Sequence, residues 1–161
     1  MVGELRPGER VLEGLAAPDG PALRFIGRIR SPWADGNCPK NIGKARETGK
    51  GAWVDLDPSF VPALTGLEPG QAVILLYWMD HARRDLLIQA PRHVDAPRGT
   101  FALRPPNRPN TISQSAVRIT AIDHDAGRID IDAIDCFDGT PLLDIKPWLA
   151  SIDIPPEPGA G

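Results

Sequence analysis

Prolines and glycines are spread along the whole chain, and this distribution limits what the chain can fold into. The 161 residues include 18 prolines and 16 glycines, about a fifth of the total against roughly 12 % in ordinary proteins. Proline breaks helices because it lacks an amide hydrogen, and both residue types are common in turns. This distribution favours many turns between short strands and argues against long helices. A chain of this length is expected to form one domain with its own core.

The stretch 115–135 is the clearest hairpin in the sequence. The segments SAVRITAID and RIDIDAID lie on either side of the turn HDAG, an arrangement typical of two antiparallel strands. In RIDIDAID the apolar residues alternate with aspartates, so the apolar residues face one side of the strand and the aspartates the other. This alternation predicts a sheet with one buried face and one face in water.

Shorter patterns predict the remaining elements. Residues 72–79, AVILLYWM, form a continuous apolar run that is typical of a strand buried on both faces. Asp57-Pro58 is a helix-start signal, and residues 34–51 are polar with four glycines, which favours a long loop. We therefore expect further strands at 25–30, 72–79, 85–90 and 100–104, a short helix at 58–64, and a loop at 34–51.

These elements show no alternation of strands with helices, so a parallel sheet is not expected. The predicted fold is mainly β, a compact antiparallel β-barrel with one or two short helices and long loops. We expect an N-terminal arm at 1–24, the barrel domain at 25–150 and a C-terminal tail at 151–161.

Composition narrows the function classes. No apolar run approaches the ~18 residues that cross a bilayer, and the N-terminus has no signal-peptide core, so we expect a soluble, cytoplasmic protein without membrane contact. Cys38 and Cys136 are expected to be free thiols, and the scattered histidines give no metal-site spacing. The net charge of −3 does not suggest a nucleic-acid binder.

The arginines are nevertheless concentrated. Between residues 81 and 118 there are seven arginines and two aspartates, a local balance of +5, so the remainder of the chain carries −8. A basic region in an acidic protein can attract an anionic ligand. A solvated, arginine-rich sheet edge explains the same pattern.

Two polar segments carry the candidate chemistry. In 104–115, RPPNRPNTISQS, three prolines stiffen the backbone, so the arginines and asparagines project from a rigid ledge suited to carboxylate or phosphate recognition. A proline-rich connection between strands is the alternative. In 135–147, DCFDGTPLLDIKP, Asp138-Gly139 predicts a turn that Thr140-Pro141 extends. Its aspartates are suited to hydroxyls or an ammonium group, or they cap turns while Lys146 pairs with one of them.

The segments NRPNTISQS (107–115) and DGTPLLDIKPW (138–148), in this order, resemble the TsaA-like family, also called TrmO or YaeB-like proteins. FIGRIRSP (25–32) is similar to the opening strand of that family. The resemblance runs from about residue 25 to 150. It implies a β-barrel that binds S-adenosylmethionine, and a homodimeric tRNA methyltransferase. Family members methylate the exocyclic nitrogen of N6-threonylcarbamoyladenosine beside the anticodon, so the resemblance implies the tRNA anticodon loop as partner.

The resemblance also implies a set of site residues. Cofactor-binding positions are Pro39, Lys40, Asn41, Asp80, His81, Arg104, Asp135, Cys136, Phe137, Asp138 and Gly139. The residues themselves supply the substrate-binding candidates, which are Asn107, Arg108 and Asn110 of the rigid ledge and Lys146 of the 135–147 segment. Within the cofactor set, Arg104 or Lys40 would meet the carboxylate of the cofactor, and Asp135 or Asp138 its ribose or amine. Asp138 and His81 are the candidates for a general base, and both could equally be structural residues or cofactor contacts.

Two other functions remain open from the sequence. The first is a methyltransferase that acts on a small metabolite or on another modified nucleotide. The second is a binding module that senses S-adenosylmethionine without catalysis. Labelled methyl transfer to tRNA separates both from the leading hypothesis.

Overall fold

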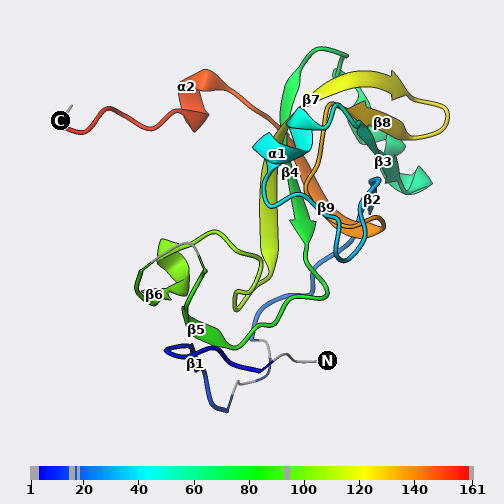
Figure 1. The fold of residues 1–161 in the computed structure, drawn as a ribbon. Coiled ribbons are helices and arrows are strands. Elements are labelled where there is room, and N and C mark those ends of the chain that lie inside the picture. Colours follow the sequence, from blue (N-terminus) through cyan, green and yellow to red (C-terminus); the bar gives the residue numbers. More distant parts are fainter. Residues whose placement is uncertain (1–3, 15–16, 18, 93–94, 160–161) are drawn as a thin grey trace. The chain divides into compact units, whose positions relative to one another are not determined.

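The computed structural model describes residues 4–14, 17, 19–92 and 95–159. The chain forms two compact units (Figure 1). We call residues 24–77 and 114–161 the barrel unit, and residues 1–23 and 78–113 the small unit. Each unit is described separately below.

A closed barrel of six strands confirms the predicted fold class. Its strands are β2 (Gly27–Arg30), β3 (Ala52–Leu56), β4 (Ala72–Trp78), β7 (Ile112–Asp123), β8 (Arg128–Ile131) and β9 (Thr140–Pro147). They follow the order β2-β3-β8-β7-β4-β9, and β9 pairs with β2 to close the ring. The pairs β2–β3, β2–β9, β3–β8, β4–β9 and β7–β8 are antiparallel. Closure removes free sheet edges, which explains how such short strands form a stable sheet.

The predicted hairpin is present as β7 and β8, and its alternation is as expected. Ile129 and Ile131 are buried in the barrel, while Asp130 and Asp132 are partly exposed. The β4 strand is also confirmed, but its burial on both faces was a wrong prediction. Alternate β4 residues are buried and those between them are only half-buried, since one face of a barrel wall is turned outward.

Three local predictions were wrong. The stretch 34–51 contains a helix, α1 (Ile42–Glu47), which begins because the side chain of Asn41 accepts a hydrogen bond from the Lys44 amide at 2.9 Å. The stretch 100–104 is not a strand, since Thr100–Ala102 forms the 3₁₀ helix η2. Thr140-Pro141 does not extend the turn, because both residues already pair with β2 at the start of β9.

The predicted helix at 58–64 is confirmed as the 3₁₀ helix η1 (Pro58–Leu64). Asp57 occupies its N-cap position, but its side chain makes no capping hydrogen bond. A short helix α2 (Ala150–Asp153) follows the barrel, within the segment predicted to be a tail.

The small unit is organised around a three-stranded antiparallel sheet. The order is β1-β5-β6, with β1 at Arg10–Val11, β5 at Leu86–Gln89 and β6 at Arg98–Gly99 (Figure 1). β5 confirms the strand expected at 85–90, and β1 lies in the stretch predicted to be an arm. The division into arm, barrel domain and tail remains a prediction.

Both cysteines are free thiols, as expected. Among the described residues, no helix has the length and apolar character needed to cross a bilayer. The same residues contain no group of three or more histidine, cysteine or acidic side chains placed to hold a metal ion.

Candidate functional site

The loop 135–139 joins β8 to β9 and is fixed against the end of β2. The amides of Asp138 and Gly139 donate to the carbonyls of Trp33 and Ile29 at 2.8 and 2.9 Å. The Ser31 hydroxyl donates to the Cys136 carbonyl at 2.7 Å. Gly139 has φ +80°, a conformation that glycine adopts without strain. The predicted turn is therefore confirmed, and its backbone is already ordered.

Asp138 is paired with an arginine that the sequence analysis did not single out. Its carboxylate accepts two hydrogen bonds from the Arg30 guanidinium at 2.8 and 3.0 Å and a third from the Ser31 amide at 3.1 Å. The hydrogen bond from Arg30 is the main cause that lowers the pKa of Asp138 below its ordinary value. A carboxylate with a lowered pKa is a weaker base, so this contact disfavours Asp138 as the general base.

Asp135 lies at the end of a buried hydrogen-bonded chain in the barrel wall. The hydroxyls of Tyr77 and Ser115 are 2.9 Å apart, and the Ser115 hydroxyl donates to Asp135 Oδ1 at 3.1 Å. Tyr77 and Ser115 are buried, and burial raises the pKa of Tyr77. The pair therefore holds one carboxylate oxygen of Asp135 in a fixed direction.

The negative charge of Asp135 also acts on both thiols. Burial raises the pKa of Cys38 to about 11 and the pKa of Cys136 to about 12, and in each case the Asp135 charge adds to the effect. Since the Asp135 charge acts on Cys38, the thiol that precedes Pro39 lies near Asp135. Both thiols are neutral at physiological pH and are poor nucleophiles.

Within the 39–41 segment the three predicted residues differ in what they offer a ligand. Pro39 is half-buried, and Lys40 and Asn41 are exposed. The side-chain oxygen of Asn41 is used to cap α1. Lys40 has no ion pair with any side chain in the described part of the chain, so its ammonium is available for an anionic group.

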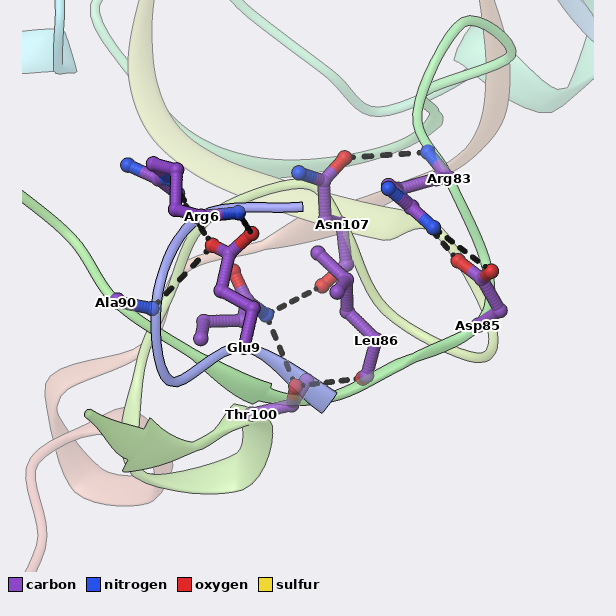
Figure 2. A network of polar contacts seen from close by, with 9 residues as sticks. Arg6, Glu9, Arg83, Asp85, Leu86, Ala90, Thr100 and Asn107 are labelled. Atoms are coloured by element: carbon purple, nitrogen blue, oxygen red, sulfur yellow. Dashed lines mark hydrogen bonds and ion pairs between the residues drawn. The ribbon is translucent and has the colours of Figure 1, made fainter. Parts of the chain in front are cut away.

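In the small unit, the predicted substrate residues Asn107 and Arg108 are held by hydrogen bonds within the unit, and Figure 2 shows those of Asn107. Asn107 Oδ1 accepts from the Arg83 amide at 3.1 Å, and the Asn107 carbonyl accepts from Gln89 at 2.8 Å. The Arg108 guanidinium donates to the Leu103 carbonyl at 2.8 Å. These contacts give Asn107 and Arg108 a structural role in shaping the ledge.

Asn110 is held in a similar way. Its side-chain oxygen accepts from Arg84 at 3.3 Å, and Arg84 also donates to the Pro109 carbonyl at 2.7 Å. The Arg84 guanidinium lies over the Trp78 ring, 5.4 Å from its centre. The stiff ledge predicted from its prolines is thus further stiffened by arginines 83 and 84.

The remaining small-unit candidates are exposed. Asp80 and His81 follow β4, and their side chains are 3.7 Å apart. Arg104 is exposed, and its side chain makes no hydrogen bond or ion pair that joins it to another described residue. Arg104 therefore resembles Lys40 in offering an unpaired positive charge.

Lys146 is paired within β9. Its ammonium lies 2.8 Å from Asp144 Oδ2, and this hydrogen bond raises the pKa of Lys146. The contact confirms the alternative in which Lys146 pairs with an aspartate of its own segment.

Two surface cavities lie on the barrel unit, and none of the predicted site residues lines either of them. The first has a volume of about 300 Å³ and is lined by Arg46, Ala72, Ala116, Val117, Arg118, Asp132 and Trp148. The second has a volume of about 290 Å³ and is lined by Phe25, Gly27, Arg28, Arg30, Asp55, Leu56 and Asp57. Arg30, the partner of Asp138, connects the second cavity to the 135–139 loop.

Sequence reasoning missed the residues that hold these loops in place. Gln89, Tyr77 and Ser115 are buried polar side chains within strands. The available signal was a single polar residue at a core-facing position, such as glutamine at the end of LLIQ. Arg30 gave no signal, because its partner lies 108 residues away in the sequence.

Comparison with known proteins places this chain among S-adenosylmethionine-related proteins. An Archaeoglobus fulgidus protein described as a probable S-adenosyl-L-methionine-binding protein is 36% identical over 135 residues, covering 81% of this chain and 35% of the relative. The Rhizobium radiobacter protein VirR, with the same description, is 35% identical over 126 residues, 78% of this chain and 70% of the relative. The putative S-adenosylmethionine-dependent methyltransferase RcsF of Pseudomonas aeruginosa is 42% identical over 106 residues, 62% of this chain and 45% of RcsF.

Solved structures of TrmO also match the fold of this chain. A crystal structure of TrmO matches with a TM-score of 0.68 and 33% identity, covering 86% of this chain and 62% of TrmO. TrmO from Pseudomonas aeruginosa matches with a TM-score of 0.66 and 32% identity, covering 86% and 60%. This chain thus spans about a third of the Archaeoglobus relative and about three fifths of the solved TrmO chains. The family model for the tRNA-methyltransferase O N-terminal domain matches residues 28–154, and the chain therefore belongs to that family.

Proposed function

We propose that this protein binds S-adenosylmethionine and transfers its methyl group to an adenosine of tRNA. The observation that carries the proposal is the match of residues 28–154 to the tRNA-methyltransferase O N-terminal domain. The names of the relatives, which refer to S-adenosylmethionine binding or to a dependent methyltransferase, support the choice of methyl donor. We further propose the exocyclic nitrogen of N6-threonylcarbamoyladenosine beside the anticodon as the acceptor, a homodimer as the active form, and the cytoplasm as the location.

The side chains of the barrel unit fit parts of this methyl donor. The donor has a positively charged amine, a carboxylate and ribose hydroxyls. Asp135, oriented by Ser115, offers a carboxylate for the amine or the hydroxyls. Lys40 offers an exposed ammonium for the donor carboxylate. In the small unit, Arg104 is the candidate for the same carboxylate, and Asp80 and His81 remain candidate contacts.

Methyl transfer from the donor is an in-line displacement at its sulfonium carbon, and the donor supplies the activated methyl group. The task of the protein is to align donor and acceptor and to exclude water, so positioning dominates the rate enhancement. The 135–139 loop is suited to this task because its backbone is already fixed by Trp33, Ile29 and Ser31.

The acceptor nitrogen becomes nucleophilic as it loses its proton, so a base within hydrogen-bond reach would assist. Asp138 is disfavoured because its carboxylate is held by Arg30 and its pKa is lowered. We therefore assign the base role to His81, the residue type used most often for general-base catalysis.

A second function has an observation in its favour. Several relatives are described only as S-adenosyl-L-methionine-binding proteins. A module that binds S-adenosylmethionine without transferring its methyl group fits these descriptions.

One pair of measurements tests these functions. Titration calorimetry with S-adenosylhomocysteine should show saturable binding, and its absence refutes both functions. The protein is then incubated with methyl-labelled donor and tRNA from its own source, with and without the threonylcarbamoyl modification. Label in modified tRNA alone supports the proposal. Binding without label in tRNA or in a small-molecule extract supports the binding module.

A further inference from the structure

Phe101 is a large aromatic side chain that is exposed to solvent. It lies in the middle of η2 and is 84% exposed, the highest exposed fraction among the large apolar side chains that the structure describes. A single exposed apolar residue is ordinary on a protein surface. Phe101 differs because of how its turn is fixed and which charges lie beside it.

The turn that carries Phe101 is fixed at its first residue. Thr100 is 3% exposed, and its hydroxyl donates to the Leu86 carbonyl at 2.7 Å. The same hydroxyl accepts a hydrogen bond from the side-chain amide of Gln89 at 2.9 Å (Figure 2). Buried, satisfied polar groups of this kind specify one arrangement.

The segment is fixed again at Asn107. The amide of Gln89, itself 2% exposed, also donates to the Asn107 carbonyl at 2.8 Å, so one side chain joins both ends of the stretch 100–107. Two prolines, at 105 and 106, stiffen the backbone between them. A side chain on such a segment reaches its binding conformation without losing much backbone entropy.

Along the sequence, the charged residues within five positions of Phe101 are Arg98 and Arg104. No acidic residue occurs between Asp95 and Asp123. Arg98, on β6, and Arg104 are exposed, and neither side chain has a hydrogen bond or ion pair with another described residue. The backbone of Arg98 is held by the pairing of β6 with Gln89 on β5.

An exposed aromatic face beside unpaired guanidinium groups matches the chemistry of an unpaired nucleotide. Unpaired bases stack on aromatic rings, and arginines bind the adjacent phosphates. Aromatic residues and arginine are also enriched at protein–protein interfaces, so the choice of RNA over a protein partner comes from the proposed function.

We propose that Phe101 stacks on an unpaired base of an RNA ligand and that Arg98 contacts a phosphate next to that base. The inference rests on the proposed function for its choice of RNA, and it deepens that function by naming side chains that hold the acceptor strand. Arg104 stays assigned to the methyl donor.

The test uses the full chain with Phe101→Ala, Phe101→Leu and Phe101→Tyr, and with Ile152→Ala as a matched control at another exposed apolar position. The first readout is the Kd for a fluorescent single-stranded RNA oligonucleotide, which needs no methyl transfer. The second is the KM and kcat of labelled methyl transfer to tRNA. Alanine and leucine are expected to raise the Kd and KM about 10-fold, while tyrosine and the control remain within about 2-fold and kcat is unchanged.

Two results would refute the stacking contact. The first is an unchanged Kd in Phe101→Ala. The second is wild-type affinity in Phe101→Leu, since leucine cannot stack. Sedimentation velocity gives a further check, because a change of oligomeric state in Phe101→Ala would assign the residue to contact with a second copy of the chain.

The phosphate contact has its own readout. Arg98→Ala should weaken RNA binding regardless of sequence and reduce the slope of log K against log salt by about 1. Arg24→Ala, which removes an exposed arginine of the barrel unit, is the control for net charge. An equal change of slope in both variants refutes the contact.

The two proposals fail separately. If the wild type methylates tRNA and Phe101→Ala does so with unchanged KM, only the stacking contact is refuted. If the wild type transfers no methyl group to tRNA but loses oligonucleotide affinity in Phe101→Ala, the stacking contact is supported and the methyl-transfer function is refuted.

Discussion

Replacing Gln89 should show how much its two side-chain hydrogen bonds stabilise the small unit. Its buried amide donates to Thr100 at 2.9 Å and to the Asn107 carbonyl at 2.8 Å. Gln89→Met keeps the side-chain length and removes both donors. Each hydrogen bond contributes about 1 kcal/mol net, and a buried acceptor left unpaired costs about 1–3 kcal/mol. The more apolar methionine offsets part of this loss, so we expect a net destabilisation of about 2 kcal/mol.

Hydrogen exchange followed by mass spectrometry measures this locally. About 2 kcal/mol corresponds to roughly 30-fold faster exchange of amides that open with the unit, and the increase should appear in peptides spanning 86–89 and 100–108. Gln114→Met is the matched control, because Gln114 is exposed on β7. If Gln89→Met exchanges within about 2-fold of the wild type in those peptides, the joining role assigned to Gln89 is incorrect.

Three further predictions concern the barrel unit. Asp138→Asn should lower the free energy of unfolding at pH 6 by about 0.5–1 kcal/mol, since the Arg30 pair is partly exposed. The pKa of Asp138 is lowered on folding, so this contribution is present above its unfolded pKa of about 4 and is lost as the pH falls through its folded pKa. Urea unfolding at pH 6 and near pH 2 should therefore show the wild-type advantage shrinking, and an equal advantage at both would contradict the pairing. The raised pKa values of Cys38 and Cys136, about 11 and 12, predict slow reaction with a thiol reagent at pH 7.5 in the native protein and fast reaction in denaturant; equally fast native labelling would refute their burial. Gly27→Ala should destabilise the barrel by about 1–3 kcal/mol, because a Cβ atom there would overlap the backbone of β3, and an unchanged thermal midpoint would show that the strands separate easily.

The wall of the barrel was predictable because its signals are local. Alternating apolar residues in RIDIDAID and the turn before it define β7 and β8 without reference to any distant residue. Alternation also explains why the prediction for β4 was half right. A continuous apolar run identifies the strand, but it does not reveal that one face of a closed barrel is only half covered.

The short helices were less predictable because they depend on single side-chain contacts. The helix α1 begins at one hydrogen bond, which the Asn41 side chain accepts from the Lys44 amide, within a stretch whose polarity suggests a loop. The turn η2 forms where a strand was expected, and the buried hydroxyl of Thr100 is held there by residues of β5. The pattern of residue types along the chain does not predict such hydrogen-bond partners.

The candidate site was also only partly predictable from the sequence. The family resemblance predicts which loops contact a ligand, and the family model matches the region that contains all of them. It does not distinguish residues that shape a loop from residues that contact a ligand. Arg108 and Asn110 were assigned to substrate from their place in a stiff ledge, yet both make hydrogen bonds within the small unit.

The polar candidates fall into two groups, those with an ion-pair partner and those without one. Asp138 and Lys146 each have an ion-pair partner within the barrel unit, so a ligand would have to displace that partner to use the full charge. Lys40 and Arg104 have no ion pair among the described residues, so an anionic group could bind them without breaking an existing contact. Removing a paired residue should therefore reduce stability, but only slightly, because both pairs are partly exposed. Removing an unpaired residue should leave stability unchanged and act on affinity alone. We therefore predict that the paired residues stabilise the loops and that the unpaired cations Lys40 and Arg104 attract the anionic group of a ligand.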